Sequence, residues 1–225
     1  MAIVGVIPAA GYGTRLQPLA GSKEMLPIGG RPVMDYLVDR LRIGGCSQLR
    51  VVTRPEKTDV IAHAKELGAE VILGYPPTVS TSFVAGMDGL AHDDIVLIGF
   101  PDTLWEPEDG YRQLLHVIER VCDVALGLFR IEPSELRRSD VVVRGGPDGR
   151  IAGIDIKPAK PRSEWIWGCA AARVLTLSGL GDVAWPGEYF DLLCKEGRDL
   201  RGIPLSDVWL DVGTKAALNR ANSAP

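Results

Sequence analysis

Apolar runs of strand length alternate with amphipathic stretches of helix length through the first half of the chain. Residues 3–7 form a short, continuous apolar run, which is typical of a strand buried on both faces. Val33, Leu37 and Leu41 recur at helical spacing after it. The same pattern predicts strands at residues 49–53, 69–73, 95–100 and 124–129, and helices at 56–67, 80–90 and 108–121. This alternation predicts an α/β fold with a mixed, mainly parallel sheet and helices on both of its faces.

The pattern changes after about residue 132. Two strand-like stretches, 140–144 and 151–157, flank a loop rich in glycine, which predicts a β-hairpin. The elements expected after it are a strand at 166–174, a helix at 188–196, two short strands near Ile203 and Trp209, and a C-terminal helix from Thr214. Because no long linker or internal repeat interrupts the chain, we predict one domain over residues 1–225, with halves at about 1–131 and 132–225.

Composition and charge narrow the class of protein. The chain has 225 residues, of which 46% are hydrophobic, and this suits one domain with a substantial core. Its net charge of −4 gives no general attraction for nucleic acid. The four cysteines (Cys46, Cys122, Cys169 and Cys194) form no CxxC pair, which favours reduced core thiols over a zinc site or a disulfide framework. With no signal-peptide pattern and no apolar stretch near the roughly 20 residues that a membrane span needs, we predict a cytoplasmic protein without a membrane partner.

The glycine-containing loop that follows the first strand is the strongest chemical signal in the sequence. Gly11 and Gly13 let the backbone approach a ligand and turn its N–H groups toward an anion. Arg15 adds a guanidinium suited to phosphate oxygens. Leu16 stands where the dinucleotide fingerprint needs glycine, and the GK[ST] ending of the P-loop is absent. The loop lies beyond the carboxyl end of a strand, where open α/β sheets bind ligands, so we predict an anion site of another type.

Residues 11–36, GYGTRLQPLAGSKEMLPIGGRPVMDY, resemble the signature of the sugar-1-phosphate nucleotidylyltransferases, the glucose-1-phosphate uridylyl- and thymidylyltransferase type. The resemblance implies a Rossmann-like sheet with a small, inserted β-rich part that binds the acceptor. It also implies transfer of a nucleotide from a nucleoside triphosphate to a sugar 1-phosphate, with Mg²⁺ as cofactor and release of pyrophosphate. UTP or dTTP is the preferred donor, because the KEMLPI run resembles enzymes that use them. Relatives often assemble, so a homo-oligomer is a further expectation.

Three later segments extend this resemblance. IVLIGFPDT resembles the strand that ends in the family's metal-binding aspartate, here Asp102, and WLDVGT resembles the segment whose aspartate, here Asp211, completes the metal site. The IKP segment resembles the one whose lysine, here Lys157, holds the acceptor phosphate. Two carboxylates plus substrate phosphates are an ordinary ligand set for magnesium.

The resemblance therefore assigns roles to particular residues. Arg15 and Lys23 are the expected catalytic cations. The expected nucleotide-binding residues are Ala9, Ala10, Gly11, Gly13, Thr14, Arg15 and Ser82. Lys157 is expected on the acceptor side, together with Trp167. Trp165 and Trp167 share one face of their strand, so they either line an acceptor pocket or pack in the core.

The sequence also departs from the family pattern. Residues 76–83 contain no glutamine where many relatives read the base, which leaves Ser80, Thr81 and Ser82 as candidates and the base preference open. Ile156 replaces the glutamate that usually precedes the lysine. Two alternatives therefore stay open: a cytidylyltransferase that acts on a phosphorylated alcohol such as phosphocholine, and a non-catalytic regulator that binds nucleotide or sugar phosphate.

Overall fold

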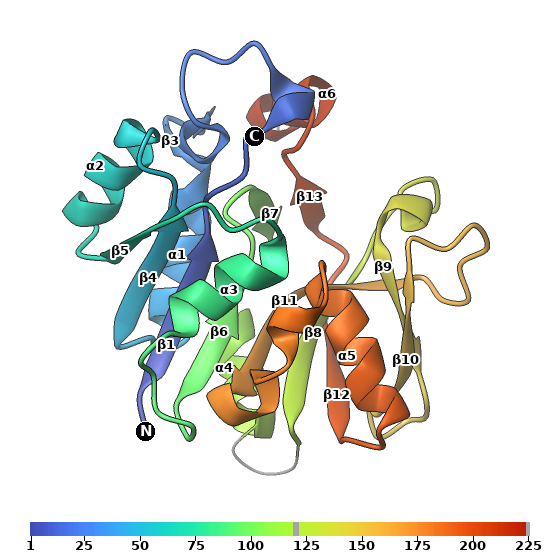
Figure 1. Cartoon of the computed structure of the whole chain (residues 1–225). Coiled ribbons are helices and arrows are strands. Elements are labelled where there is room, and N and C mark those ends of the chain that lie inside the picture. Colours follow the sequence, from blue (N-terminus) through green and yellow to red (C-terminus); the bar gives the residue numbers. More distant parts are fainter. Residues whose placement is uncertain (119–121, 224–225) are drawn as a thin grey trace.

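A computed structural model describes residues 1–118 and 122–223 of the chain. Within this range, nine strands form one central sheet, and Figure 1 shows it running through the whole molecule. These strands are β1 (Ile3–Pro8), β4 (Gln48–Thr53), β5 (Glu70–Leu73), β6 (Ile95–Ile98), β8 (Val124–Arg130), β9 (Asp140–Arg144), β10 (Ile151–Ile156), β11 (Trp165–Arg173) and β12 (Leu200–Ser206). Short pairs, β2 (Pro27–Ile28) with β3 (Arg31–Pro32) and β7 (Thr103–Trp105) with β13 (Trp209–Asp211), lie outside it.

The sheet has a parallel half and a mixed half. Strands β5, β4, β1 and β6 are parallel neighbours, so their carboxyl ends meet at one edge. Strand β11 then pairs antiparallel with both β6 and β8, and β12 pairs parallel with β8. The predicted hairpin is present as the antiparallel pair β9 and β10. The mixed, mainly parallel α/β sheet expected from the sequence is thus confirmed.

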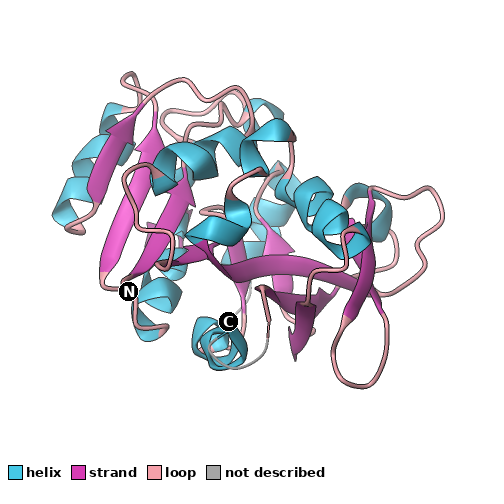
Figure 2. Ribbon diagram, turned by 60° about the horizontal axis from the view of Figure 1, so that its bottom comes forward, coloured by secondary structure: helices cyan, strands magenta, loops and turns pink. Residues whose placement is uncertain are grey.

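Helices cover both faces of the sheet (Figure 2). The helices are α1 (Val33–Ile43), α2 (Thr58–Glu66), α3 (Val79–Met87), α4 (Gly110–Ile118), α5 (Pro186–Lys195) and α6 (Lys215–Ser223). Helices α1, α2 and α4 pack on one face and share a buried core with alternate residues of β1 and β6, among them Ile7 and Leu97. Helices α3 and α5 pack on the other face, α3 against β1 and α5 against β10, and belong to a second buried core that includes Val6 and Ile98. This is the two-sided burial that the continuous apolar strands predicted.

Most element boundaries differ from the predictions by one or two residues. The strand near Ile203, predicted to be short, covers Leu200–Ser206 because β8 supplies a partner along its length. The helix predicted over 108–121 is described from Gly110 to Ile118, and residues 119–121 lie outside the described part. The three-residue strand β7 was not predicted, because so short a segment carries no periodic signal.

Two exclusions made from the sequence can be compared with the structure. All four cysteines are free, and Cys169 is completely buried, so burial raises the pKa of its thiol. None of the helices in residues 1–118 and 122–223 has the length and apolar character that crossing a bilayer requires.

Candidate active site

The glycine-containing loop leaves the carboxyl end of β1 and closes in a short 3₁₀ helix, Thr14–Leu16. Gly13 adopts the left-handed conformation, with φ of 62°, and a Cβ there would lie 3.2 Å from Cβ of Lys23. The left-handed conformation therefore favours glycine at this position, and a side chain there would also crowd Lys23. Leu16 is buried and anchors the loop, whereas the side chain of Arg15 is 69% exposed. The loop holds Arg15 at the protein surface, next to the edge where the strands end.

Two acids that are far apart in the sequence meet at this edge. Asp102 follows β6, and Asp211 ends β13, which pairs with β7 so that Asp211 lies opposite Thr103. The N–H of Val212 donates to the carbonyl of Asp102 over 2.8 Å. Burial, followed by the charge of Asp102, raises the pKa of Asp211, so the two carboxylates are close enough to interact. The structure thus brings together the two acids that the sequence proposed as metal ligands.

Each acid has a cationic neighbour. The ammonium of Lys23 forms an ion pair with Asp102, and the guanidinium of Arg15 lies 3.8 Å from Asp211. Burial works against the charge on Lys23, but the carboxylates of Asp102 and Glu24 outweigh it and raise the pKa of the lysine. Burial of Asp102 is likewise outweighed by Lys23, which lowers the pKa of the aspartate. Lys23 and Asp102 therefore stay ionised as a pair at neutral pH.

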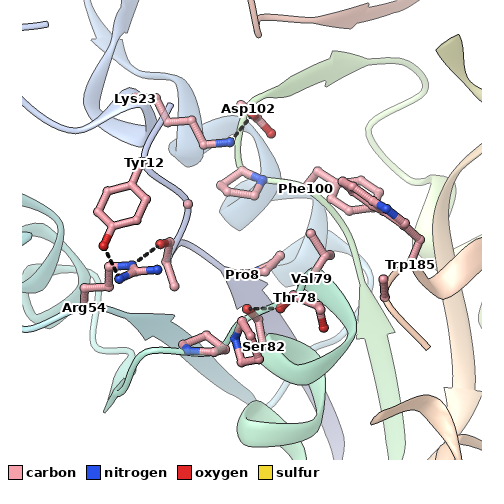
Figure 3. Close-up of a pocket in the computed structure, with 16 residues that line it drawn as sticks. Pro8, Tyr12, Lys23, Arg54, Thr78, Val79, Ser82, Phe100, Asp102 and Trp185 are labelled. Atoms are coloured by element: carbon pink, nitrogen blue, oxygen red, sulfur yellow. Dashed lines mark hydrogen bonds and ion pairs between the residues drawn. The ribbon is translucent and has the colours of Figure 1, made fainter. Parts of the chain in front are cut away.

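This ion pair separates two cavities. A cavity of about 170 Å³ lies against Gly13, Thr14 and Arg15. A larger one of about 480 Å³ extends from Lys23 and Asp102 toward α3 and Trp185 (Figure 3). Both cavities are lined by Lys23 and Asp102. The small cavity is bordered by charge and backbone and suits phosphate, whereas the larger one adds apolar and hydroxyl-bearing walls and suits the rest of a nucleotide or its acceptor.

The predicted nucleotide-binding residues at the start of the loop differ in whether they line a cavity. Ala10 and Gly11 line the larger cavity, but Ala9 is completely buried and its carbonyl accepts bonds from Thr53 and Lys57. Ala9 can therefore act only through the backbone of the loop.

Three hydroxyl residues were candidates for contacting the base. Ser82 lines the larger cavity and donates to the carbonyl of Thr78 over 3.1 Å. Thr81 is engaged with Thr78 in the capping box of α3, and Ser80 is fully buried. Within the described part of the chain, Ser82 is the one of these three residues that lines the larger cavity.

The acceptor-side candidates differ from one another in exposure. Lys157 has a left-handed backbone, with φ of 44°, and its ammonium lies 4.2 Å from the ring centroid of Trp185. Trp167 is only 6% exposed, and its ring packs 5.5 Å from that of Phe100 in the core below the cavity. The exposed indole is that of Trp185 at the start of α5, which lines the larger cavity.

Sequence reasoning missed Tyr12, Arg54 and Trp185, all of which line the larger cavity. Arg54 follows β4, so the rule that ligands sit beyond the carboxyl ends of parallel strands could have found it. Its guanidinium donates to the carbonyl of Ala10 over 2.6 Å and lies 3.9 Å from the ring centroid of Tyr12. Trp185 lies outside any motif, and no local signal marks it.

The proteins to which this chain is similar are nucleotidyltransferases, which agrees with the geometry of the site. The chain belongs to the MobA-like NTP transferase family, because the model of that domain matches residues 5–136, more than half of the sequence. A glucose-1-phosphate thymidylyltransferase of Streptomyces griseus is 25% identical over 236 residues, covering 96% of this chain and 64% of the relative. Another, of Mycolicibacterium smegmatis, is 28% identical over 171 residues, covering 72% of this chain and 57% of the relative. The chain thus spans less than two thirds of the length of these two relatives.

Solved structures extend the comparison to the fold. A UDP-glucose pyrophosphorylase complexed with UDP-glucose superimposes with a TM-score of 0.82 at 16% identity, over 99% of this chain and 97% of the other. Likeness at this low identity establishes the fold, and the Rossmann-like class implied by the family resemblance is confirmed.

Proposed function

We propose that this protein is a nucleotidyltransferase that joins a nucleoside triphosphate, UTP or dTTP by preference, to a sugar 1-phosphate. The observation that carries the proposal is the meeting of Asp102 and Asp211 beside a loop that bears Arg15. Family membership and similarity to glucose-1-phosphate thymidylyltransferases support it. In this proposal, residues of about 1–131 bind the nucleotide and those of about 132–225 bind the acceptor.

The proposed reaction is an in-line displacement at phosphorus. An ionised phosphate oxygen of the acceptor forms a bond to the α-phosphorus, while the bond from that phosphorus to the bridging oxygen breaks and pyrophosphate leaves with the electron pair. Arg15 and Lys23 offset the negative charge, and the loop N–H groups orient the triphosphate. An acceptor phosphate is already a competent nucleophile, so no side chain has to remove a proton.

The acidic pair fits Mg²⁺. The described residues contain no group of three or more histidine, cysteine or acidic side chains able to hold a metal, so the protein offers two carboxylates. Magnesium is commonly bound in this way, with phosphate oxygens and water completing its ligands. Asp102 and Asp211 would hold the ion, and when bound it would lower the repulsion between the two phosphate groups. The side chain of Asp211 is 50% exposed and its ion pair with Arg15 spans 3.8 Å, so its carboxylate is accessible to a metal ion.

Lys157 is proposed to bind the acceptor phosphate. Replacing Lys157 by methionine should raise the KM for the acceptor by about tenfold or more, because a hydrogen bond to a charged group is lost. The KM for the triphosphate should stay within about twofold, since Lys157 is absent from the described lining of the small cavity. Methionine meets the same left-handed backbone as lysine, so the substitution isolates the charge. Initial rates at varied acceptor concentration measure the effect.

The matched control is Lys160→Met, which removes the same charge from an exposed position three residues further along the chain. Equal acceptor KM values in the two variants would show that Lys157 is an ordinary surface lysine.

A second candidate function has its own observation. The ammonium of Lys157 lies over the exposed indole of Trp185, and aromatic faces bind quaternary ammonium groups in the same way. This favours, as the alternative, a cytidylyltransferase that acts on phosphocholine.

One assay separates the candidates. Pyrophosphate release is measured with UTP, dTTP, CTP, ATP and GTP, each with glucose 1-phosphate or phosphocholine, with and without Mg²⁺. Release that needs UTP or dTTP, glucose 1-phosphate and Mg²⁺ supports the first proposal. Release with CTP and phosphocholine supports the second, and binding without release in every pair supports a regulatory protein.

A further inference from the structure

A buried ion pair contacts the glycine-containing loop, and neither of its members is among the described lining residues of the two cavities. The side chain of Glu24 has no exposed surface, and its Oε2 accepts a 2.6 Å hydrogen bond from Nζ of Lys57. Its second oxygen, Oε1, is buried without a hydrogen-bond partner. Burial raises the pKa of Glu24 and lowers that of Lys57, so the protein holds both charges in an unfavourable place.

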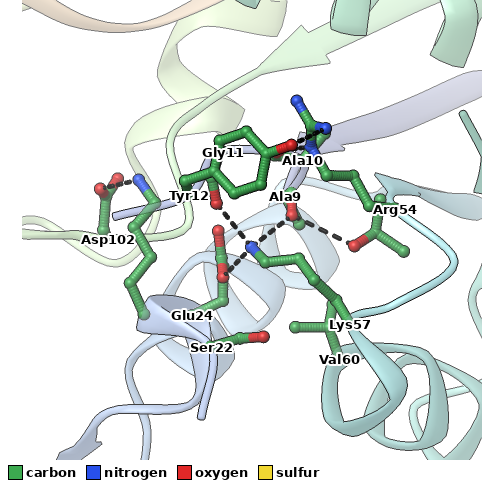
Figure 4. Close-up of polar contacts among 12 residues, drawn as sticks. Ala9, Ala10, Gly11, Tyr12, Ser22, Glu24, Arg54, Lys57, Val60 and Asp102 are labelled. Carbon is green, nitrogen blue, oxygen red and sulfur yellow. Dashed lines mark hydrogen bonds and ion pairs between the residues drawn. The ribbon is translucent and has the colours of Figure 1, made fainter. Parts of the chain in front are cut away.

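Lys57 uses its other two protons on the loop itself. Its Nζ donates to the carbonyl of Ala9 over 2.8 Å and to that of Gly11 over 2.9 Å (Figure 4). An ammonium has three donors, and all three are satisfied here. The intervening carbonyl, that of Ala10, accepts from Arg54 over 2.6 Å. Three consecutive loop carbonyls are therefore bound by side chains that follow β4.

Binding these carbonyls fixes the direction of the loop N–H groups. In a planar trans peptide the N–H points opposite to the C=O of the preceding residue. The carbonyls of residues 9–11 point toward Lys57 and Arg54, so the N–H groups of residues 10–12 point the other way. Within the described part of the chain, these three N–H groups have no hydrogen-bond acceptor. Unpaired N–H groups next to a cavity, which Ala10, Gly11 and Tyr12 line, are suited to bind an anion.

The N-terminal end of α2, which Lys57 precedes, also binds the turn that carries Lys23. Oδ1 of Asp59 accepts from the hydroxyl of Ser22 and Oδ2 from its N–H, both over 2.7 Å. Glu24 lies in the 3₁₀ helix Lys23–Met25, and its side chain binds Lys57 at the start of α2. Its neighbour Lys23 reaches Asp102 instead. Two contacts thus fix the backbone on either side of Lys23.

We propose that Glu24, Lys57 and Asp59, here named the α2 clamp, are positioning residues that set the geometry of the triphosphate site. Lys57 orients the peptide groups of the loop, and the contacts of Glu24 and Asp59 hold the turn of Lys23 at a fixed distance from that loop. The clamp touches no substrate. The role rests on the proposed function, because the ligand being positioned is the triphosphate.

Removing one member of the pair would leave an uncompensated buried charge, and the protein could then fail to fold. The informative variant is therefore the double substitution Glu24→Leu with Lys57→Met, which removes both charges and keeps the side-chain volumes similar. Replacing a buried ion pair by apolar residues is often neutral or stabilising, so Tm should be at or above that of the wild type. The carbonyl of Gly11, however, loses its donor, and that of Ala9 keeps only the hydroxyl of Thr53.

Three readouts test the clamp. In the double variant, amide hydrogen exchange should be faster by about tenfold or more at Ala9 and Leu16 of the ligand-free protein, because the loop is less restrained. These two N–H groups bind the carbonyls of Val52 and Gly13 at the ends of the loop, so their exchange reports its opening. The Kd for the Mg²⁺ complex of the preferred triphosphate, measured by calorimetry, should rise by about tenfold, and kcat should fall while the acceptor KM is unchanged. Lys57→Arg, which keeps the donors, should retain most of the affinity. Lys65→Met, an exposed lysine lost from the same helix, is the matched control.

The outcomes are distinct. A double variant with wild-type Tm, wild-type exchange at Ala9 and Leu16 and an unchanged triphosphate Kd would overturn the clamp, because the pair would then be structurally and functionally silent. A lower Tm would also overturn it if exchange and Kd, both measured below the unfolding temperature, were normal. The pair would then be purely structural. If the wild type binds no triphosphate, the proposed function fails, whereas faster loop exchange in the double variant would still support the restraint of the loop by Lys57.

Discussion

Arg15→Ala is expected to lower kcat/KM by about two orders of magnitude or more, as expected for the loss of a group that stabilises charge in the transition state. The guanidinium is the cation of the glycine-containing loop, it lines the small cavity, and it is largely exposed. Its ion pair with Asp211 spans 3.8 Å between two exposed side chains, so its loss should hardly change stability. Steady-state kinetics with Mg²⁺ present, together with thermal unfolding, measure both effects.

The control for this prediction is Arg137→Ala, which removes an exposed arginine from a 3₁₀ helix remote from the cavities in the sequence. Arg15→Lys adds a graded test, because lysine keeps the charge but loses the planar pair of donors, and it should recover only part of the activity. Turnover by Arg15→Ala within a few fold of that of Arg137→Ala would remove Arg15 from the mechanism.

The parts of the fold that could be predicted from the sequence are those with a repeating signal. The runs at residues 3–7 and 95–100 are apolar throughout because both faces of β1 and β6 are covered by helices. The glycine loop was recognisable because Gly13 meets a conformational demand that few residues satisfy. Each of these signals lies within one short segment, so it can be recognised without knowing which other residues pack against that segment.

The convergence of Asp102 and Asp211 depended on a resemblance, because its physical cause is tertiary. Strands β7 and β13 have three residues each, too few for a periodic pattern, yet their pairing is what brings the two acids together. Once this pairing is formed, Asp102 lines both cavities and pairs with Lys23.

Other site residues gave no signal because their roles arise from contacts between distant segments. Glu24 would ordinarily be taken as an exposed acid, and only the approach of Lys57 from the start of α2 explains its complete burial. Trp167 has a period-two pattern with Trp165 that fits a pocket or a core equally well. Its packing against Phe100 and Phe190 favours the core.

Asp102→Asn is expected to lower kcat/KM by about three orders of magnitude and to raise the Mg²⁺ concentration needed for half-maximal rate by about tenfold or more. An amide oxygen is a neutral and weaker ligand for a hard cation than a carboxylate. The substitution also removes the partner of Lys23, whose raised pKa keeps it charged. Some loss of stability is therefore expected as well, because a largely buried ion pair is broken.

Two further variants separate the metal role from the loss of the ion pair. Lys23→Met with Asp102→Asn removes the unpaired charge and should recover stability, but the demand for Mg²⁺ should stay high because the carboxylate is still missing. Asp93→Asn, at an exposed position beyond α3, should leave both the rate and the Mg²⁺ dependence as in the wild type. A requirement for Mg²⁺ that is the same in Asp102→Asn and in Asp93→Asn would show that Asp102 serves only to hold Lys23, and the ligand pair proposed for the cation would then have to be abandoned.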